Sequence, residues 1–145
     1  MATFNKFYQF TEHLAHGVHN LQSDTLKVYL SNSAPSYANT VYDVQVGVTG
    51  PAEISAGNGY TAGGITVTAS SSAQNLGAYK LVLSDPALIT ASGGSIGPFR
   101  FVVLYNSTAS NKLIGWWDYG TSIMLANTES FQVDFDQTNG IFTIN

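Results

Sequence analysis

The stretch around Ser95 is the part of the sequence that most resembles a catalytic motif. Gly93-Gly94-Ser95-Ile96-Gly97 fits the G-x-S-x-G pattern of a hydrolase nucleophile elbow. Such an elbow requires a strand before the serine, a helix after it and a histidine later in the chain. Here Pro98 and a strand-like segment follow, and every histidine precedes Ser95. The sequence therefore predicts a glycine-rich turn, and hydrolysis by Ser95 is the least favoured function.

Three histidines near the N-terminus suggest a metal site at first sight. His13, His16 and His19 follow one another at steps of three, which on a helix separates neighbours by about 60° and would let two of them reach one ion. Glu12 is the only nearby carboxylate, and it points elsewhere on the helix. A solvated helix face is the better interpretation, and we predict no metal.

Two further polar patterns also lack their context. Asp134, Asp136 and Asn139 loosely resemble a calcium loop, but their spacing is wrong for an EF-hand and the aspartates alternate with apolar residues as on an exposed strand face. Asn106-Ser107-Thr108 matches a glycosylation acceptor without an accompanying secretion signal. We therefore predict no catalytic residue and no cofactor.

The composition narrows the function classes further. Only 10% of the residues are charged, against about 25% in typical soluble domains, and a surface poor in charge can be apposed to another protein at little desolvation cost. The five basic residues are dispersed, which disfavours nucleic acid as a partner. Cysteine is absent, and the apolar runs are too short for a membrane span. We expect synthesis in the cytoplasm without a signal peptide.

The elements that would position any site divide into two unequal parts. Residues 4–22 carry apolar residues at steps of three and four, which would form a stripe along one side of a helix. Residues 1–23 are therefore predicted to form an amphipathic helix or arm. This stripe must pack either on the β domain of the same chain or on a neighbouring subunit. Its apolar members are Phe4, Phe7, Phe10, Leu14, Val18 and Leu21.

From residue 24 to residue 145 the apolar period changes to two, as half-buried strands require. Short strands are expected near residues 25, 44, 65, 79, 99, 112, 122 and 130, with a closing strand at 141–144. Asn139-Gly140 predicts a two-residue hairpin or part of a slightly longer turn. The pattern predicts an all-β fold with one N-terminal helix, an antiparallel β-sandwich of the immunoglobulin-like or jelly-roll kind.

Several aromatic residues are candidates for partner contact. The irregular stretch from Ser31 to Pro51 is expected to be a contact arm, although Val44–Val48 also fits an edge strand of the same domain. Trp116 and Trp117 should lie on opposite faces of one strand, one in the core and the other against a partner or a sugar. The candidate contact residues are Phe4, Phe7, Phe10, Leu14, Tyr37, Tyr42 and Trp116.

An ordered set of segments resembles the capsid decoration (cement) proteins of tailed bacteriophages. The resemblance covers nearly all of residues 26–144, and its motifs consist of turn and core residues. The segments are Leu30-Ser31-Asn32-Ser33-Ala34-Pro35, Glu53-Ile54-Ser55-Ala56-Gly57-Asn58-Gly59-Tyr60-Thr61-Ala62-Gly63-Gly64, Gly93-Gly94-Ser95-Ile96-Gly97-Pro98-Phe99-Arg100, Val103-Leu104-Tyr105-Asn106, Leu113-Ile114-Gly115-Trp116-Trp117-Asp118-Tyr119-Gly120 and Phe131-Val133-Phe135-Asn139-Gly140.

The resemblance implies a structural virion protein without catalytic residues. It would bind the outer surface of the capsid and stabilise contacts between major capsid protein subunits as a homo-oligomer, with a trimer favoured and a dimer as the alternative. Weak contacts repeated over an oligomer gain from effective concentration. The alternative is a tail or fibre component, with Trp116, Trp117 or nearby tyrosines as candidate carbohydrate contacts.

Overall fold

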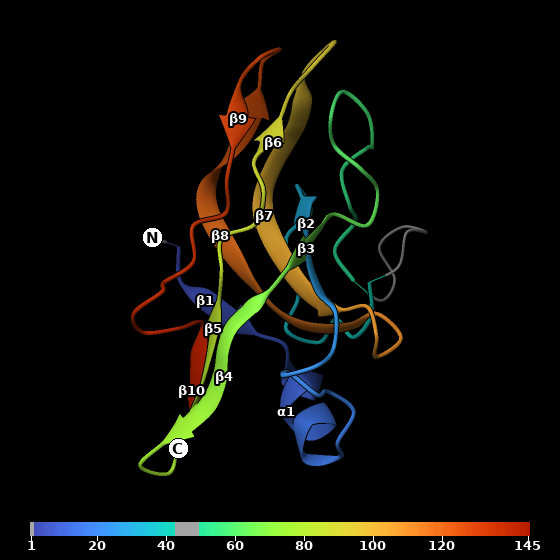
Figure 1. Ribbon diagram of the computed structural model, residues 1–145. Coiled ribbons are helices and arrows are strands. Elements are labelled where there is room, and N and C mark those ends of the chain that lie inside the picture. The colour runs from blue at the N-terminus through green and yellow to red at the C-terminus, as the bar shows by residue number, and fades with distance from the viewer. Residues whose placement is uncertain (1, 43–49) are drawn as a thin grey trace.

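The computed structural model describes residues 2–42 and 50–145. The expected strand near residue 44 lies outside these ranges, as do Val44 and Val46 of the expected contact arm. The described part is mostly β with a single short helix, so the predicted all-β fold with one N-terminal helix is confirmed. Its elements (Figure 1) are β1 Phe4–Lys6, α1 Tyr8–Ala15, β2 Leu26–Ser31, β3 Ile65–Val67, β4 Ala69–Asn75, β5 Ala78–Leu83, β6 Ile89–Thr90, β7 Ile96–Asn106, β8 Lys112–Leu125, β9 Ser130–Phe131 and β10 Phe142–Ile144.

The strands form antiparallel sheets in a sandwich-like arrangement. The largest sheet has the order β1-β8-β7-β2-β3, a second has the order β10-β5-β4, and β6 pairs with β9. The long β7 and β8 cross most of the molecule, from the end that carries β6 and β9 to the end that carries α1 (Figure 1). At that second end α1 and the β4–β5 hairpin project beside each other.

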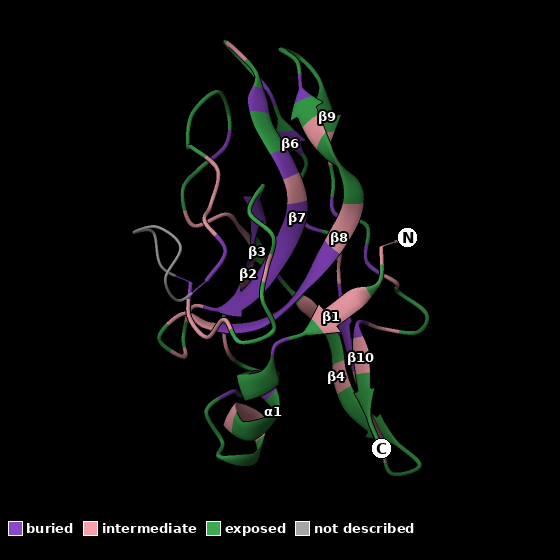
Figure 2. Cartoon of the chain, turned by 180° about the vertical axis from the view of Figure 1, so that it is seen from behind, coloured by how far each residue is buried: buried purple, intermediate pink, exposed green. Residues whose placement is uncertain are grey.

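The five-stranded sheet buries side chains on both of its faces. Consecutive residues along parts of β7 and β8 are accordingly buried (Figure 2). The larger core lies on the face of Trp117 and includes Phe10, Leu81 and Phe99. The smaller core lies on the face of Trp116. The two tryptophans therefore do point to opposite faces, but both are buried, with exposed fractions of 5% and 6%. The expectation that one of them faces a partner is wrong, because Phe7 and Tyr37 of this chain pack on Trp116.

The predicted helix is too long at both ends. Residues 4–6 form β1, which pairs with β8 in the register Phe4↔Trp117, and α1 ends at Ala15. Gly115 makes this pairing possible, since a Cβ there would collide with the Phe4 ring and with the Asn5 carbonyl. The stripe of apolar residues at helical spacing thus serves a strand, one helix and a loop, because an aromatic-rich segment can bury the same side chains in either conformation.

Other strand boundaries also differ from the prediction. β4 was not predicted, because its serine-rich sequence lacks an apolar alternation. The strands expected near 112 and 122 are one continuous β8. Asn139-Gly140 belongs to a longer turn in which Asp136 accepts backbone hydrogen bonds at 2.7 to 2.9 Å. The strand that follows pairs with β5 and not with the segment before the turn, so the simple hairpin is wrong.

Candidate interaction surface

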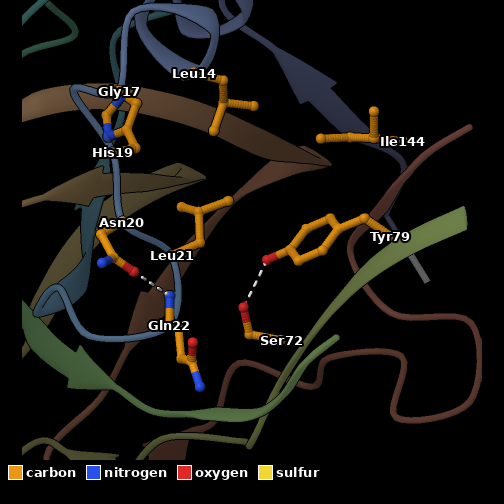
Figure 3. Close-up of a pocket in the computed structure, with 9 residues that line it drawn as sticks. All are labelled: Leu14, Gly17, His19, Asn20, Leu21, Gln22, Ser72, Tyr79 and Ile144. Atoms are coloured by element: carbon orange, nitrogen blue, oxygen red, sulfur yellow. Dashed lines mark hydrogen bonds between the residues drawn. The ribbon is translucent and has the colours of Figure 1, made fainter. Parts of the chain in front are cut away.

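An apolar groove runs between α1 with its following loop and the sheet that contains β10 (Figure 3). It consists of two hollows of about 730 Å³ and 480 Å³ that share Leu14 and Ile144. We call it the helix–sheet groove. Among the described side chains that line it, Lys6 alone carries a charge at neutral pH. The groove is therefore suited to apolar and uncharged polar groups.

The N-terminal helix positions one wall of this groove, and β4, β5 and β10 position the other. Phe10 is buried at 1% exposure and anchors α1 to the core, which leaves Leu14 half-buried on the groove side one turn later. On the opposite wall Phe142 lies with its ring centroid 5.4 Å from that of Phe10. The Ser72 and Tyr79 hydroxyls are 2.8 Å apart and join β4 to β5 (Figure 3). Ile144 completes this wall and remains 44% exposed.

A buried histidine forms part of the groove wall. His19 is only 7% exposed, and the amide of Asn106 donates to its Nδ1 at 3.1 Å and to Asp24 Oδ2 at 2.6 Å. Burial, followed by the nearby His13, lowers the pKa of His19 to about 4. The solvated helix face predicted for the histidines is thus right only for the exposed His16. His19 lies beyond the end of α1, where the loop turns back onto the sheet.

The β4–β5 hairpin next to the groove ends in an unusual turn. Asn75 pairs with Ala78, and Leu76 and Gly77 form the two-residue connection with positive φ of 51° and 86°. Positive φ at both central positions defines a type I′ turn, for which Asn-Gly is favoured. Leucine is disfavoured there, and this one is 99% exposed. A large apolar side chain is thus held at the extreme tip of a projecting hairpin.

The structure separates the predicted contact residues into buried and accessible ones. Four of them belong to the chain's own core: Phe7, Phe10, Tyr42 and Trp116. Phe4 and Leu14 are half-buried and line the helix–sheet groove. Tyr37 is 45% exposed.

Tyr37 belongs to a second surface feature. Its ring stacks on that of Tyr8, with the ring centroids 5.3 Å apart and an angle of 16° between the ring planes, and Tyr8 is 69% exposed. The Tyr37 ring also packs edge-on against Trp116, with ring centroids 4.8 Å apart, and Trp116 in turn packs on Phe7 with ring centroids 4.5 Å apart. The two tyrosines therefore form an exposed aromatic platform fixed on a buried base.

The described part of the expected contact arm forms hydrogen bonds with other residues of its own chain. The backbone N–H of Tyr42 donates to Asn111 at 2.9 Å. Glu53 accepts hydrogen bonds from the hydroxyls of Tyr42 at 2.5 Å and Tyr60 at 2.7 Å. Burial, together with the hydrogen bond to Glu53, raises the pKa of both tyrosines above its ordinary value. This cluster is structural, because its donors and its acceptor satisfy one another.

The motifs that suggested chemistry occupy other places in the fold. Ser95 is exposed immediately before β7, without the helix that a nucleophile elbow needs. Asp134 is exposed, and Asp136 is the acceptor of the turn described above. Asn106 is fully buried, so it is not available as a glycosylation acceptor. Within residues 2–42 and 50–145, no three His, Asp or Glu side chains gather to hold a metal ion.

Sequence reasoning missed Leu76, Phe142 and Ile144. The signal for Leu76 is present in Asn75-Leu76-Gly77, an apolar residue inside a turn-forming sequence that follows a polar segment. Phe142 and Ile144 fall in the predicted closing strand, but their place in the groove could not be predicted, because alternation does not reveal which sheet a strand joins.

Comparison with known proteins adds no assignment: no protein-family model, no curated protein and no solved structure matches this chain. In the part of the chain that the structure describes, no helix combines the length and the apolar character needed to cross a bilayer.

Proposed function

We propose that this chain is a structural virion protein of a tailed phage that decorates the outer surface of the capsid. The observation that carries the proposal is the placement of large exposed apolar side chains at separate positions on a charge-poor chain. Leu76 is at the hairpin tip, Leu88 (59% exposed) directly precedes β6, and Met124 (53% exposed) lies near the end of β8. Each of these side chains can contribute apolar contact area to an interface, because burying apolar surface against a partner is favourable.

The arrangement suits a protein that bridges two neighbours. β6 and the end of β8 lie at the end of the molecule opposite to the β4–β5 tip (Figure 1). Contacts of the β6 end with the capsid and of the opposite end with a neighbouring copy would let a homo-oligomer hold adjacent subunits of the major capsid protein together, and repetition over the oligomer strengthens weak contacts. The resemblance of residues 26–144 to decoration proteins supports the same role, and a trimer is the expected form.

Binding to capsids tests this proposal. Expanded, DNA-free capsids assembled from the major capsid protein of the phage that encodes this chain should bind it saturably in a sedimentation assay, with symmetric density on the outer surface by cryo-electron microscopy. The double variant Leu88→Ser and Met124→Ser should bind at least about tenfold more weakly, since it removes two contacts of apolar side chains. A matched control, Thr61→Ser, changes an exposed polar residue and should bind normally. Failure of the unmodified protein to saturate such capsids would contradict the proposal.

A tail or fibre protein that binds carbohydrate is the second candidate. The Tyr8–Tyr37 platform favours it, because an exposed aromatic face can stack on a sugar ring. Trp116 and Trp117 cannot do so, since both are buried. Binding to a glycan array that is lost in Tyr8→Ala, together with density on the tail and none on the capsid, would favour this candidate over decoration.

A further inference from the structure

The β4–β5 tip and the helix–sheet groove are complementary in chemistry. Leu76 offers one fully exposed apolar side chain at the end of a projecting hairpin. The groove offers apolar walls from Phe4, Leu14 and Phe142, and each of its two hollows is larger than a leucine side chain. The hairpin forms one wall of the groove of its own chain, so its tip points away from that groove and cannot fill it.

We propose that Leu76 of one copy of this chain inserts into the helix–sheet groove of a second copy. The inference rests on the homo-oligomer part of the proposed function and names the contact that would build it. A solution measurement without capsids tests it separately from capsid binding.

The backbone at the tip supports an interaction role for Leu76. A leucine at φ 51° is strained, and such strain is retained where function requires the side chain. Local stability would favour asparagine at this position, since Asn-Gly is the preferred type I′ sequence. The leucine contributes nothing to its own core, because 99% of its surface is exposed.

The charges of the two surfaces permit close contact. Residues 69–79 contain no Asp, Glu, Lys or Arg. Among the described side chains that line the groove, only that of Lys6 is charged. The inner side of the hairpin presents Ser72 and Tyr79, whose hydroxyls already hydrogen-bond to each other. Burying these groups therefore costs little desolvation, whereas burying Leu76 is favourable.

The substitution Leu76→Asn separates this contact from folding. It suits the positive φ and should leave the stability of the folded monomer unchanged or higher, measured at a concentration where the unmodified protein is also dissociated, while it removes the apolar side chain. We expect the unmodified protein to sediment as an oligomer at micromolar concentration. In Leu76→Asn the dissociation constant of the oligomer should be about 10- to 100-fold higher, which shifts the protein towards the 15.5 kDa monomer. Leu88→Asn, which alters another exposed leucine away from the hairpin, should sediment as the unmodified protein does.

Cysteine pairing identifies the place of the contact. The chain has no cysteine, so single variants Leu76→Cys and Leu14→Cys, given different mass tags and mixed, can report cross-links between copies. We expect a mixed disulfide between the two variants under mild oxidation, and none when Leu14→Cys is replaced by Thr121→Cys on the exposed part of β8. A dimer or a trimer with the mixed cross-link supports the proposal. A monomeric unmodified protein, or an oligomer that survives Leu76→Asn without the cross-link, overturns it.

Discussion

Acidification should weaken this fold through one buried side chain, His19. The Asn106 amide fixes its neutral form, because Asn106 Oδ1 accepts from the backbone N–H groups of Thr108 and Ala109 at 3.0 Å and its Nδ2 therefore faces the His19 ring. His19 Nδ1 must then be the acceptor. Protonation would place a second donor against the amide, at a residue that is only 7% exposed.

The size of the effect follows from the two pKa values. An unfolded histidine has a pKa near 6.5, whereas burial lowers the pKa of folded His19 to about 4. The folded state therefore binds this proton less well, so stability is complete above pH about 6.5 and is lost as the pH falls towards about 4. The gap corresponds to about 3 kcal/mol of unfolding free energy. Burial also lowers the pKa of His13, which adds to the loss in the same direction.

Other titrating groups act in a different pH range. Hydrogen bonds from Arg100 lower the pKa of Asp118, and those from Asn139 lower the pKa of Asp136. A carboxylate with a lowered pKa stabilises the fold above its unfolded pKa and loses this effect only at lower pH, below about 4. The histidine contribution can therefore be read between pH about 6.5 and about 4.

Urea denaturation at several pH values in this range measures the prediction. The free energy of unfolding should fall with acidification, with a slope approaching about 1.4 kcal/mol per pH unit for one proton. His19→Gln should lose this part of the slope, although it also lowers stability at neutral pH. His16→Gln, at an exposed position just after α1, should retain the slope. If the unmodified protein and His19→Gln show the same slope, or if the His19 ring titrates near pH 6.5 by NMR, the reasoning is refuted.

Three further outcomes are expected. Phe10→Ala should destabilise the isolated protein by about 3–5 kcal/mol in urea denaturation, because Phe10 joins α1 to the main core; a loss below about 1 kcal/mol would mean that the helix does not belong to that core. Glu53→Gln should cost about 1–3 kcal/mol by weakening two tyrosine hydrogen bonds, and an unchanged melting temperature would argue against the structural role of this cluster. Ser95→Ala should leave both stability and capsid binding unchanged, and loss of an esterase activity in this variant would revive the hydrolase alternative.

Much of the fold could be predicted from local patterns. Alternation in segments such as Leu26–Leu30 predicted strands, because a half-buried strand needs apolar residues on one face. The missing context of Ser95 argued against an elbow, since that motif is defined by the elements on either side of it. The opposite orientations of Trp116 and Trp117 followed from the two-residue period alone.

The tertiary structure decided which of these surfaces remain accessible. Alternation tells that Trp116 and Trp117 face opposite sides, but it does not tell that Phe7 and Tyr37 cover the second side. The apolar stripe of residues 4–22 predicted burial, but the partner of Phe4 proved to be β8, more than one hundred positions later in the chain. Leu76 is exposed because β4 and β5 project beyond the core.

The sequence by itself determined the periodicity of the elements, the scarcity of charge and the absence of cysteine. It could not determine the helix–sheet groove, because the two walls come from α1 and β10 at opposite ends of the chain. It could not determine the low pKa of His19 either, since that depends on burial and on Asn106, 87 positions away. Periodicity is a property of neighbours in sequence, whereas accessibility and desolvation depend on contacts that only the folded chain brings together.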